Sequence, residues 1–236
     1  MCIRDRLQDY QGYVQSDGYS GYNPLFTPQD NRIAVGCWAH VRRKFKDIID
    51  AQPKNIQPGI AEQLLTLIQK LYAIERKATK DGRTVQQLTE IRQKKSKPIL
   101  DNIKTILDDV ISRTPPKGLL GKAVTYTLNQ WSKLIVYIEQ GYIPIDNNAA
   151  ENNIRPFALG RKNWLFSGHA DSAQASANLF TLIENAKLYN LKVFDYLKYV
   201  FDRIGDAKTD RDYEQLTPKY AKQFVPSIKS HKKATQ

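Results

Sequence analysis

The feature that most constrains the fold is a long run of helical periodicity in the middle of the chain. Apolar side chains recur every three or four residues across 60–74, which places them along one face of an amphipathic helix. Comparable patterns run from about Val85 to Ser112 and from about Leu119 to Glu139. We therefore expect residues 54–140 to form a helical module, inserted between two parts of another domain.

Before this module, two short segments have the composition of strands. Gly12 to Ser16 is rich in β-favouring residues, and Arg32 to Gly36 resembles a more buried strand. The residues between them, from Tyr19 to Phe26, suggest only a short helical turn. A strand pair joined in this way is expected to be parallel, so the sequence predicts an α/β fold that is mostly α, with few strands.

After the module, helical patterns return. We expect helices near Asn148, from Ala170 to Tyr189 and from Val193 to Ile204, with an irregular or extended stretch from Arg161 to Ser167. The predicted domains are a core made of residues 7–50 and 141–205, the insertion at 54–140, and a loose, polar, basic tail at 206–236.

Composition narrows the class of partner. The chain of 236 residues has 36 basic and 24 acidic side chains, a formal charge of +12 that favours a polyanion. Charge alone leaves DNA, RNA and an acidic membrane surface open. Two cysteines cannot form a disulfide framework, which predicts a reducing cytoplasm, and no apolar run approaches the ~20 residues of a membrane span. No nucleotide-binding glycine loop and no serine-hydrolase elbow is present.

Asp17 is the first candidate for chemistry. It stands where the first predicted strand ends in an Asp-Gly turn, and strand ends of α/β sheets commonly bind ligands. A carboxylate there could bind Mg²⁺, which prefers oxygen ligands. The alternative is a structural turn in which Asp17 accepts backbone N–H groups and Gly18 supplies a positive φ.

Glu151 is the second candidate, in the first turn of a predicted helix. From there it could bind a metal together with another carboxylate. Two structural roles compete, because Asn148 and Glu151 have the spacing of a capping box and Glu151 could pair with Arg155. Glu184 is a weaker candidate, since Lys187 stands at ion-pairing distance along the helix.

Two further groups of residues suggest supporting roles. Cys37 and His40 offer two metal ligands, but a tetrahedral zinc site needs four, so we expect a buried Cys37 and a His40 in the first helical turn. Basic residues and one aromatic follow Glu151 and suit a phosphodiester backbone: Arg155, Arg161, Lys162 and Trp164. The alternative is a solvated basic loop with Trp164 anchored in the core.

Taken together, several ordered segments resemble the transposase of the insertion sequence 66 (IS66) family. The likeness extends over about 7–204, weakens at 182–187, and is carried by the segments 9–19, 36–45, 145–151, 154–156 and 159–168. The resemblance implies a ribonuclease-H-like fold, here a partial core interrupted by the helical insertion. It also implies a D-D-E set of carboxylates, in which Asp17 is the second Asp and Glu151 is the Glu.

The resemblance further implies a mechanism and partners. Two Mg²⁺ (or Mn²⁺) ions would support phosphodiester cleavage and strand transfer at the ends of an insertion sequence, within a homo-oligomeric synaptic complex. The residues implied to bind DNA are Arg42, Arg43, Arg155, Arg161 and Lys162. The implied supporting residues are Cys37 and His40, which resemble a C-x-x-H element of related transposases, together with Asn147, Asn148 and Trp164.

One part of the D-D-E set has no counterpart here. The family's first Asp lies on an earlier strand, and Asp5 and Asp9 precede the matching segment too closely to replace it. We therefore expect this chain to be an N-terminally truncated catalytic domain that is weak or inactive in cleavage alone. The alternative is a non-catalytic, basic, helical DNA-binding protein. An RNA-binding module is less favoured, because the aromatic signature of the common RNA folds is missing.

Overall fold

The computed structural model describes residues 7, 9–27, 29, 31–53, 59–164 and 167–227, without the side chains of 161, 162 and 164. The chain divides into two compact units, Met1–Ala149 and Ala150–Gln236. Each unit is described by itself.

The sheet of the first unit has two strands among the described residues. β1 (Gly12–Gln15) pairs in parallel with β2 (Arg32–Val35), in a register that joins Gly12 to Arg32 and Gln15 to Val35. A 3₁₀ helix, η1 (Ser20–Leu25), forms part of the connection. Both predicted strands and their parallel pairing are confirmed. The chain is mostly helical, as expected, while the ribonuclease-H-like core stays a prediction.

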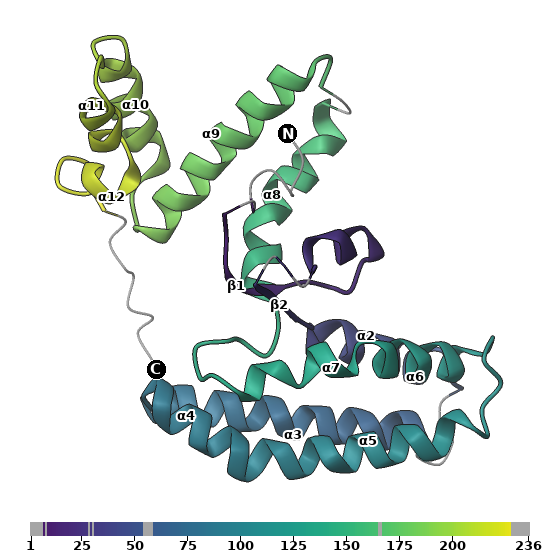
Figure 1. The fold of residues 1–236 in the computed structure, drawn as a ribbon. Helices are drawn as coiled ribbons and strands as arrows, with labels where there is room; N and C mark the ends of the chain where they lie inside the picture. Colours follow the sequence, from purple (N-terminus) through teal and green to yellow (C-terminus); the bar gives the residue numbers. More distant parts are fainter. Residues whose placement is uncertain are drawn as a thin grey trace. The chain divides into compact units, whose positions relative to one another are not determined.

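The remaining elements of the first unit are helices (Figure 1). They are α2 (Trp38–Asp50), α3 (Ile60–Lys80), α4 (Val85–Ile91), the π-helical η2 (Arg92–Ser96), α5 (Lys97–Ile111), α6 (Leu119–Asn129), α7 (Trp131–Leu134) and the 3₁₀ helix η3 (Val136–Ile138). α4, η2 and α5 form the single helix expected from Val85 to Ser112. The helix expected from Leu119 to Glu139 is instead broken at Gln130 and Ile135.

The helices α2, α3, α5, α6, α7 and η3 form one hydrophobic core with β2, because their apolar side chains face inward. Trp38 and Phe45 of α2, Leu64 of α3, Leu107 of α5 and Val124 of α6 are all buried in it. Helices of the predicted insertion thus share their core with α2. The division into a core and an insertion at 54–140 remains a prediction.

The second unit contains five helical elements among its described residues. They are α8 (Asn148–Trp164), which begins at the end of the first unit, α9 (Ala170–Leu188), α10 (Val193–Ile204), α11 (Asp210–Gln215) and α12 (Pro218–Ala221). The second core is formed by Ala186, Leu191, Tyr196, Val200, Leu216, Ala221 and Val225. The Tyr196 hydroxyl donates to the Leu216 carbonyl at 2.9 Å, which fixes α10 to the end of α11.

Two expectations for this part of the chain are wrong. The stretch expected to be irregular from Arg161 is helical to Trp164, since α8 continues beyond Pro156. The tail expected to be loose from residue 206 is folded to Ser227, because Leu216, Ala221 and Val225 supply apolar contacts to α9 and α10. Residues 228–236 lie outside the described residues.

Candidate active site

The candidate site begins at the carboxyl end of the parallel strand pair. The Ser16 N–H donates to the Val35 carbonyl at 3.0 Å, which extends the pairing by one residue beyond β1. Asp17 follows β1, and Cys37 follows β2 by two residues. Because parallel strands end at the same edge of a sheet, the two residues lie at the edge where ligands of α/β folds commonly bind.

The turn that carries Asp17 is held from three sides. Asp17 Oδ1 accepts the Tyr19 N–H at 3.0 Å, and the Tyr126 hydroxyl of α6 donates to the Asp17 carbonyl at 2.6 Å. Gly18 has a φ of +81°, and a Cβ at this position would lie 2.8 Å from the side chain of Gln130. The turn role expected for Asp17 and Gly18 is therefore observed, and the partly exposed carboxylate retains its second oxygen for other contacts.

Tyr126 remains a hydrogen-bond donor over a wide pH range. Burial is the largest cause that raises the pKa of Tyr126 to about 12, and the charges of Cys37 and Asp17 add to it. The Lys44 Nζ of α2 lies 4.4 Å from the centre of the Tyr126 ring. This brings a cation from α2 close to the Asp17 turn, a contact that the sequence analysis missed.

Cys37 is buried between β2 and α2, with 2% of its surface exposed, as expected. Burial raises the pKa of its thiol, an effect opposed by hydrogen bonds from the backbone of Asn147, His40 and Ala39. The thiol is therefore protonated at neutral pH. His40 lies in the first turn of α2, also as expected.

The chain returns to this edge through residues 144–147. Gln15 Nε2 donates to the Gly36 carbonyl at 3.2 Å and to the Pro144 carbonyl at 2.9 Å, and the Trp38 N–H donates to the Ile145 carbonyl at 3.2 Å. These bonds attach the segment before α8 to both strands. Gln15 and Pro144 are thus in contact although they are 129 residues apart in the sequence.

Asp146 is a carboxylate at this edge that the sequence analysis did not identify as a site residue. It accepts the Tyr72 hydroxyl of α3 at 2.8 Å, the Asn148 N–H at 3.1 Å and Asn148 Nδ2 at 2.9 Å. Asp146 thus caps the start of α8 and ties it to α3. Burial first, and then the bond to Asp146, strongly raise the pKa of Tyr72, so the phenol remains a donor.

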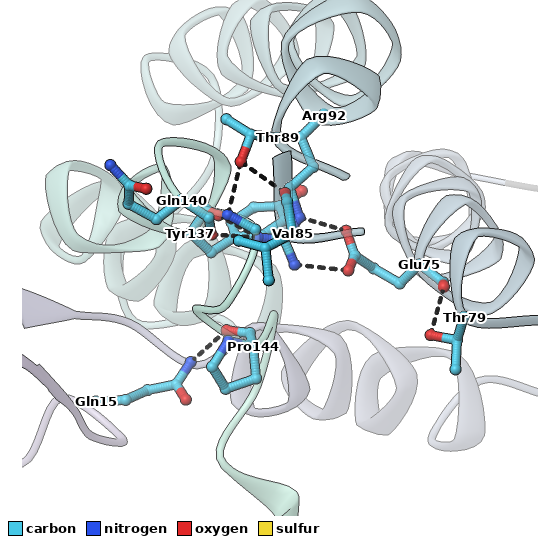
Figure 2. A network of polar contacts seen from close by, with 10 residues as sticks. Gln15, Glu75, Thr79, Val85, Thr89, Arg92, Tyr137, Gln140 and Pro144 are labelled. Atoms are coloured by element: carbon cyan, nitrogen blue, oxygen red, sulfur yellow. Dashed lines mark hydrogen bonds and ion pairs between the residues drawn. The ribbon is translucent and has the colours of Figure 1, made fainter. Parts of the chain in front are cut away.

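A buried arginine fixes the segment that leads to this edge (Figure 2). Arg92, 1% exposed, donates to both carboxylate oxygens of Glu75 at 2.9 and 2.7 Å. Its Nη1 also donates to the carbonyls of Tyr137 and Gln140, at 2.6 and 2.7 Å. The Gly141 N–H is satisfied by Thr89 Oγ1 at 2.8 Å.

The other predicted site residues are distributed as follows. Arg42 and Arg43 are exposed on α2, in the first unit. Glu151 is partly buried in the first turn of α8, and Arg155 is exposed one turn later. The side chains of Arg161, Lys162 and Trp164 lie outside the described part of the structure. Glu184 binds Lys187 at 2.6 Å, which confirms the pairing expected for it.

Comparison with known proteins identifies the family. A model described as the Transposase IS66 family matches residues 1–175, which include Asp17, Cys37, Asp146 and Glu151. The chain belongs to the IS66 transposase family. A second model, the IS66 C-terminal element, matches residues 181–218 of this IS66 chain, from the end of α9 to the start of α12. The region from residue 206, which was expected to be a loose tail, therefore begins within this C-terminal element of the family.

Three relatives from Sinorhizobium fredii (strain NBRC 101917 / NGR234) bear the names uncharacterized protein y4hP, y4jD and y4qI. The identities are 31% over 222 residues, 31% over 220 and 28% over 223, covering 89%, 90% and 92% of this chain. The matches cover only 40%, 42% and 40% of the relatives, so the IS66 chain spans about two fifths of their length. No solved structure matches the chain. Among the described residues, no helix is long and apolar enough to cross a bilayer.

Proposed function

We propose that this IS66 chain is part of a D-D-E DNA transposase that cleaves and joins phosphodiester bonds at the ends of an insertion sequence. Asp17 and Glu151 supply two of the three carboxylates. The observation that best supports the proposal is the position of Asp17 at the carboxyl end of a parallel strand pair, in a chain of this family. The strand pair would belong to a ribonuclease-H-like core.

Asp17 would supply an oxygen ligand for Mg²⁺ or Mn²⁺. Asp17 offers a partly exposed carboxylate oxygen, and hard cations prefer oxygen ligands. Asn147, whose backbone hydrogen-bonds with Cys37, has a buried Oδ1 without a hydrogen-bond partner among the described residues, and this atom would offer a second oxygen ligand. Bound divalent ions would activate a water and neutralise the charge of the in-line displacement.

The chain's own residues would position these groups and the DNA. The bonds from Tyr126 and Tyr19 hold the Asp17 turn, while Asp146 caps the helix that carries Glu151. Cys37 and His40 would support the strand end, with Asn148 and Trp164 beside Glu151. Arg42, Arg43, Arg155, Arg161 and Lys162 would bind phosphates, within a homo-oligomeric complex on DNA.

Exchange of the carboxylates tests the proposal. Asp17→Asn and Glu151→Gln, introduced into a full-length transposase that contains these residues, should each abolish Mg²⁺-dependent cleavage of terminal-repeat DNA. Asp50→Asn is the matched control, because Asp50 is exposed and paired with Lys46 at 2.6 Å. Cleavage that survives both site exchanges would refute the assignment.

Metal binding gives an independent measurement on the 236 residues alone. Titration with Mn²⁺ should show a site that Asp17→Asn weakens and Asp50→Asn does not. Nicking by these residues alone should be weak or absent, because the first Asp has no counterpart in the segment before Asp17. Unchanged Mn²⁺ binding in Asp17→Asn would favour the non-catalytic DNA-binding alternative.

A further inference from the structure

The basic charge of the chain is concentrated in one short segment of the first unit. Residues 70–97 contain nine Lys and Arg and three Asp and Glu, a surplus of six. This is half of the chain's formal charge of +12, in fewer than 30 of its 236 residues. We call residues 70–97 the basic segment. A surplus of this density favours binding to a polyanion.

Most of this charge is available at the surface. Within the basic segment, Arg92 and Glu75 form a buried pair and neutralise each other. The eight other basic side chains are exposed: Lys70, Arg76, Lys77, Lys80, Arg83, Lys94, Lys95 and Lys97. They belong to α3, the α3–α4 turn, η2 and the first residue of α5.

Three of these side chains line the same hollow, although they are up to 18 residues apart. Lys77 of α3, Arg83 of the turn and Lys95 of η2 border a hollow of about 190 Å³, together with Ile74, Ile91 and Asp81. The hollow therefore has three cationic groups and one carboxylate. Arg83 reaches Asp81 only at 3.8 Å, a long and partly exposed contact that leaves the guanidinium able to bind another anion.

The π-helical η2 contributes to this arrangement. Lys94 and Lys95 follow Arg92, which is held inward by Glu75 and two carbonyls. Because Arg92 occupies the buried side of η2, the next two lysines are directed to the surface, where both are exposed. Among the described residues, neither Lys77 nor Lys95 forms an ion pair, unlike Lys46 and Lys104 elsewhere in the unit.

We infer that the basic segment is a second DNA-binding site, in which Lys77, Arg83 and Lys95 bind backbone phosphates of a duplex. The ligand chemistry, a phosphodiester, follows from the cationic hollow, while the choice of duplex DNA rests on the proposed function. The site is separate from Asp17 and Glu151 in sequence and in chemistry. It binds without reading bases, because the contacts are to phosphates.

The test is a salt titration of DNA binding with the 236-residue chain. Fluorescence anisotropy with a labelled duplex gives the affinity at several salt concentrations, for the native chain and for Lys77→Gln/Lys95→Gln. The plot of log affinity against log salt has a negative slope, to which each phosphate contact contributes roughly 0.9 in magnitude. The double variant should therefore make this slope less steep by about 1.8. Arg83→Gln added to it should make the slope less steep still.

The matched control removes the same charge from the same unit. Lys104 of α5 is paired with Asp108, and Arg113, just after α5, is paired with Asp109. The variant Lys104→Gln/Arg113→Gln should therefore leave the slope nearly unchanged. Equal slopes in the two double variants would overturn the site, as would undetectable duplex binding by a folded native chain. Tighter binding to RNA than to duplex DNA would overturn the choice of ligand.

A further variant separates this inference from the proposed function. Asp17→Asn/Glu151→Gln should bind the duplex with the native salt slope, because neither residue contacts the hollow. Loss of cleavage when the same two exchanges are made in a full-length transposase concerns the active site alone, and loss of slope in Lys77→Gln/Lys95→Gln concerns the basic segment alone. Circular dichroism on every variant confirms that the helices are retained.

Discussion

Gly18 shows how a single residue can control the candidate ligand beside it. Its φ of +81° lies in the left-handed region, which costs a residue with a Cβ about 1–2 kcal/mol. The side chain of Gln130 also occupies the space that a Cβ would need. A residue larger than glycine should therefore strain the turn that carries Asp17 and require the end of the Gln130 side chain to move.

Gly18→Ala should destabilise the first unit more than Gly82→Ala does. Gly82 has a φ of +62° with no atom within 4 Å of an added Cβ, so its variant measures backbone strain alone. Gly18→Ala also requires the end of the Gln130 side chain to move, which should add less than the ~1–3 kcal/mol of an overpacked core because that side chain is flexible. Urea unfolding of both variants gives the difference, and equal losses would show that Gln130 moves aside at no cost.

At the scale of secondary-structure elements, η2 interrupts an otherwise regular helix between α4 and α5. Pro98 lies in the first turn of α5 and has no N–H to donate, which favours a local change of hydrogen bonding just before it. Arg92, the first residue of η2, donates hydrogen bonds to Glu75 and to the carbonyls of Tyr137 and Gln140. The element therefore connects α3 with the chain that returns to the strand ends.

Arg92→Ala should lower the free energy of unfolding by about 3–5 kcal/mol, since it leaves the Glu75 carboxylate largely buried and without its partner. Glu75→Gln/Arg92→Met should recover part of this loss, because no charge is then left buried. Lys104→Ala breaks an exposed pair and should cost less than about 1 kcal/mol. Chemical denaturation measures all three, and a loss for Arg92→Ala as small as that of the control would contradict the role of the network.

The elements that the sequence predicted well are those with a clear period. The two strands and the helices beginning at Ile60, Ala170 and Val193 follow from spacing and turn residues. In the site, Asp17, Cys37 and Glu151 could be proposed from motifs. The Asp146–Tyr72 bond could not, because it joins residues 74 positions apart.

The errors also have physical reasons. Residues 206–227 contain few apolar side chains, so the sequence suggested a loose tail, yet three of these side chains suffice to pack on α9 and α10. The stretch from Arg161 was expected to be irregular, yet α8 continues through it to Trp164 with Pro156 inside the helix.

At the scale of the whole molecule, the chain has two separate hydrophobic cores. Leu64 is fully buried in the first core and Leu191 in the second. Leu64→Ala and Leu191→Ala should each cost about 2–5 kcal/mol, but in different parts of the chain. The cost includes the cavity that each variant leaves.

Hydrogen exchange measured by mass spectrometry can assign each loss to its unit. Leu64→Ala should reduce amide protection in α2, α3 and α5, and Leu191→Ala should reduce it in α9 and α10. A uniform loss of protection along the chain in either variant would show that the two cores unfold as one cooperative unit.

Because Cys37 is buried, its reactivity can be used to measure how often the candidate site opens. A protonated thiol with almost no exposed surface reacts with a maleimide only when the packing between β2 and α2 opens transiently. The alkylation rate of the Cys37 peptide, resolved from Cys2 by mass spectrometry, would therefore measure how often the strand end opens. Slower alkylation on addition of Mn²⁺ would indicate that an ion bound nearby holds this end of the sheet closed.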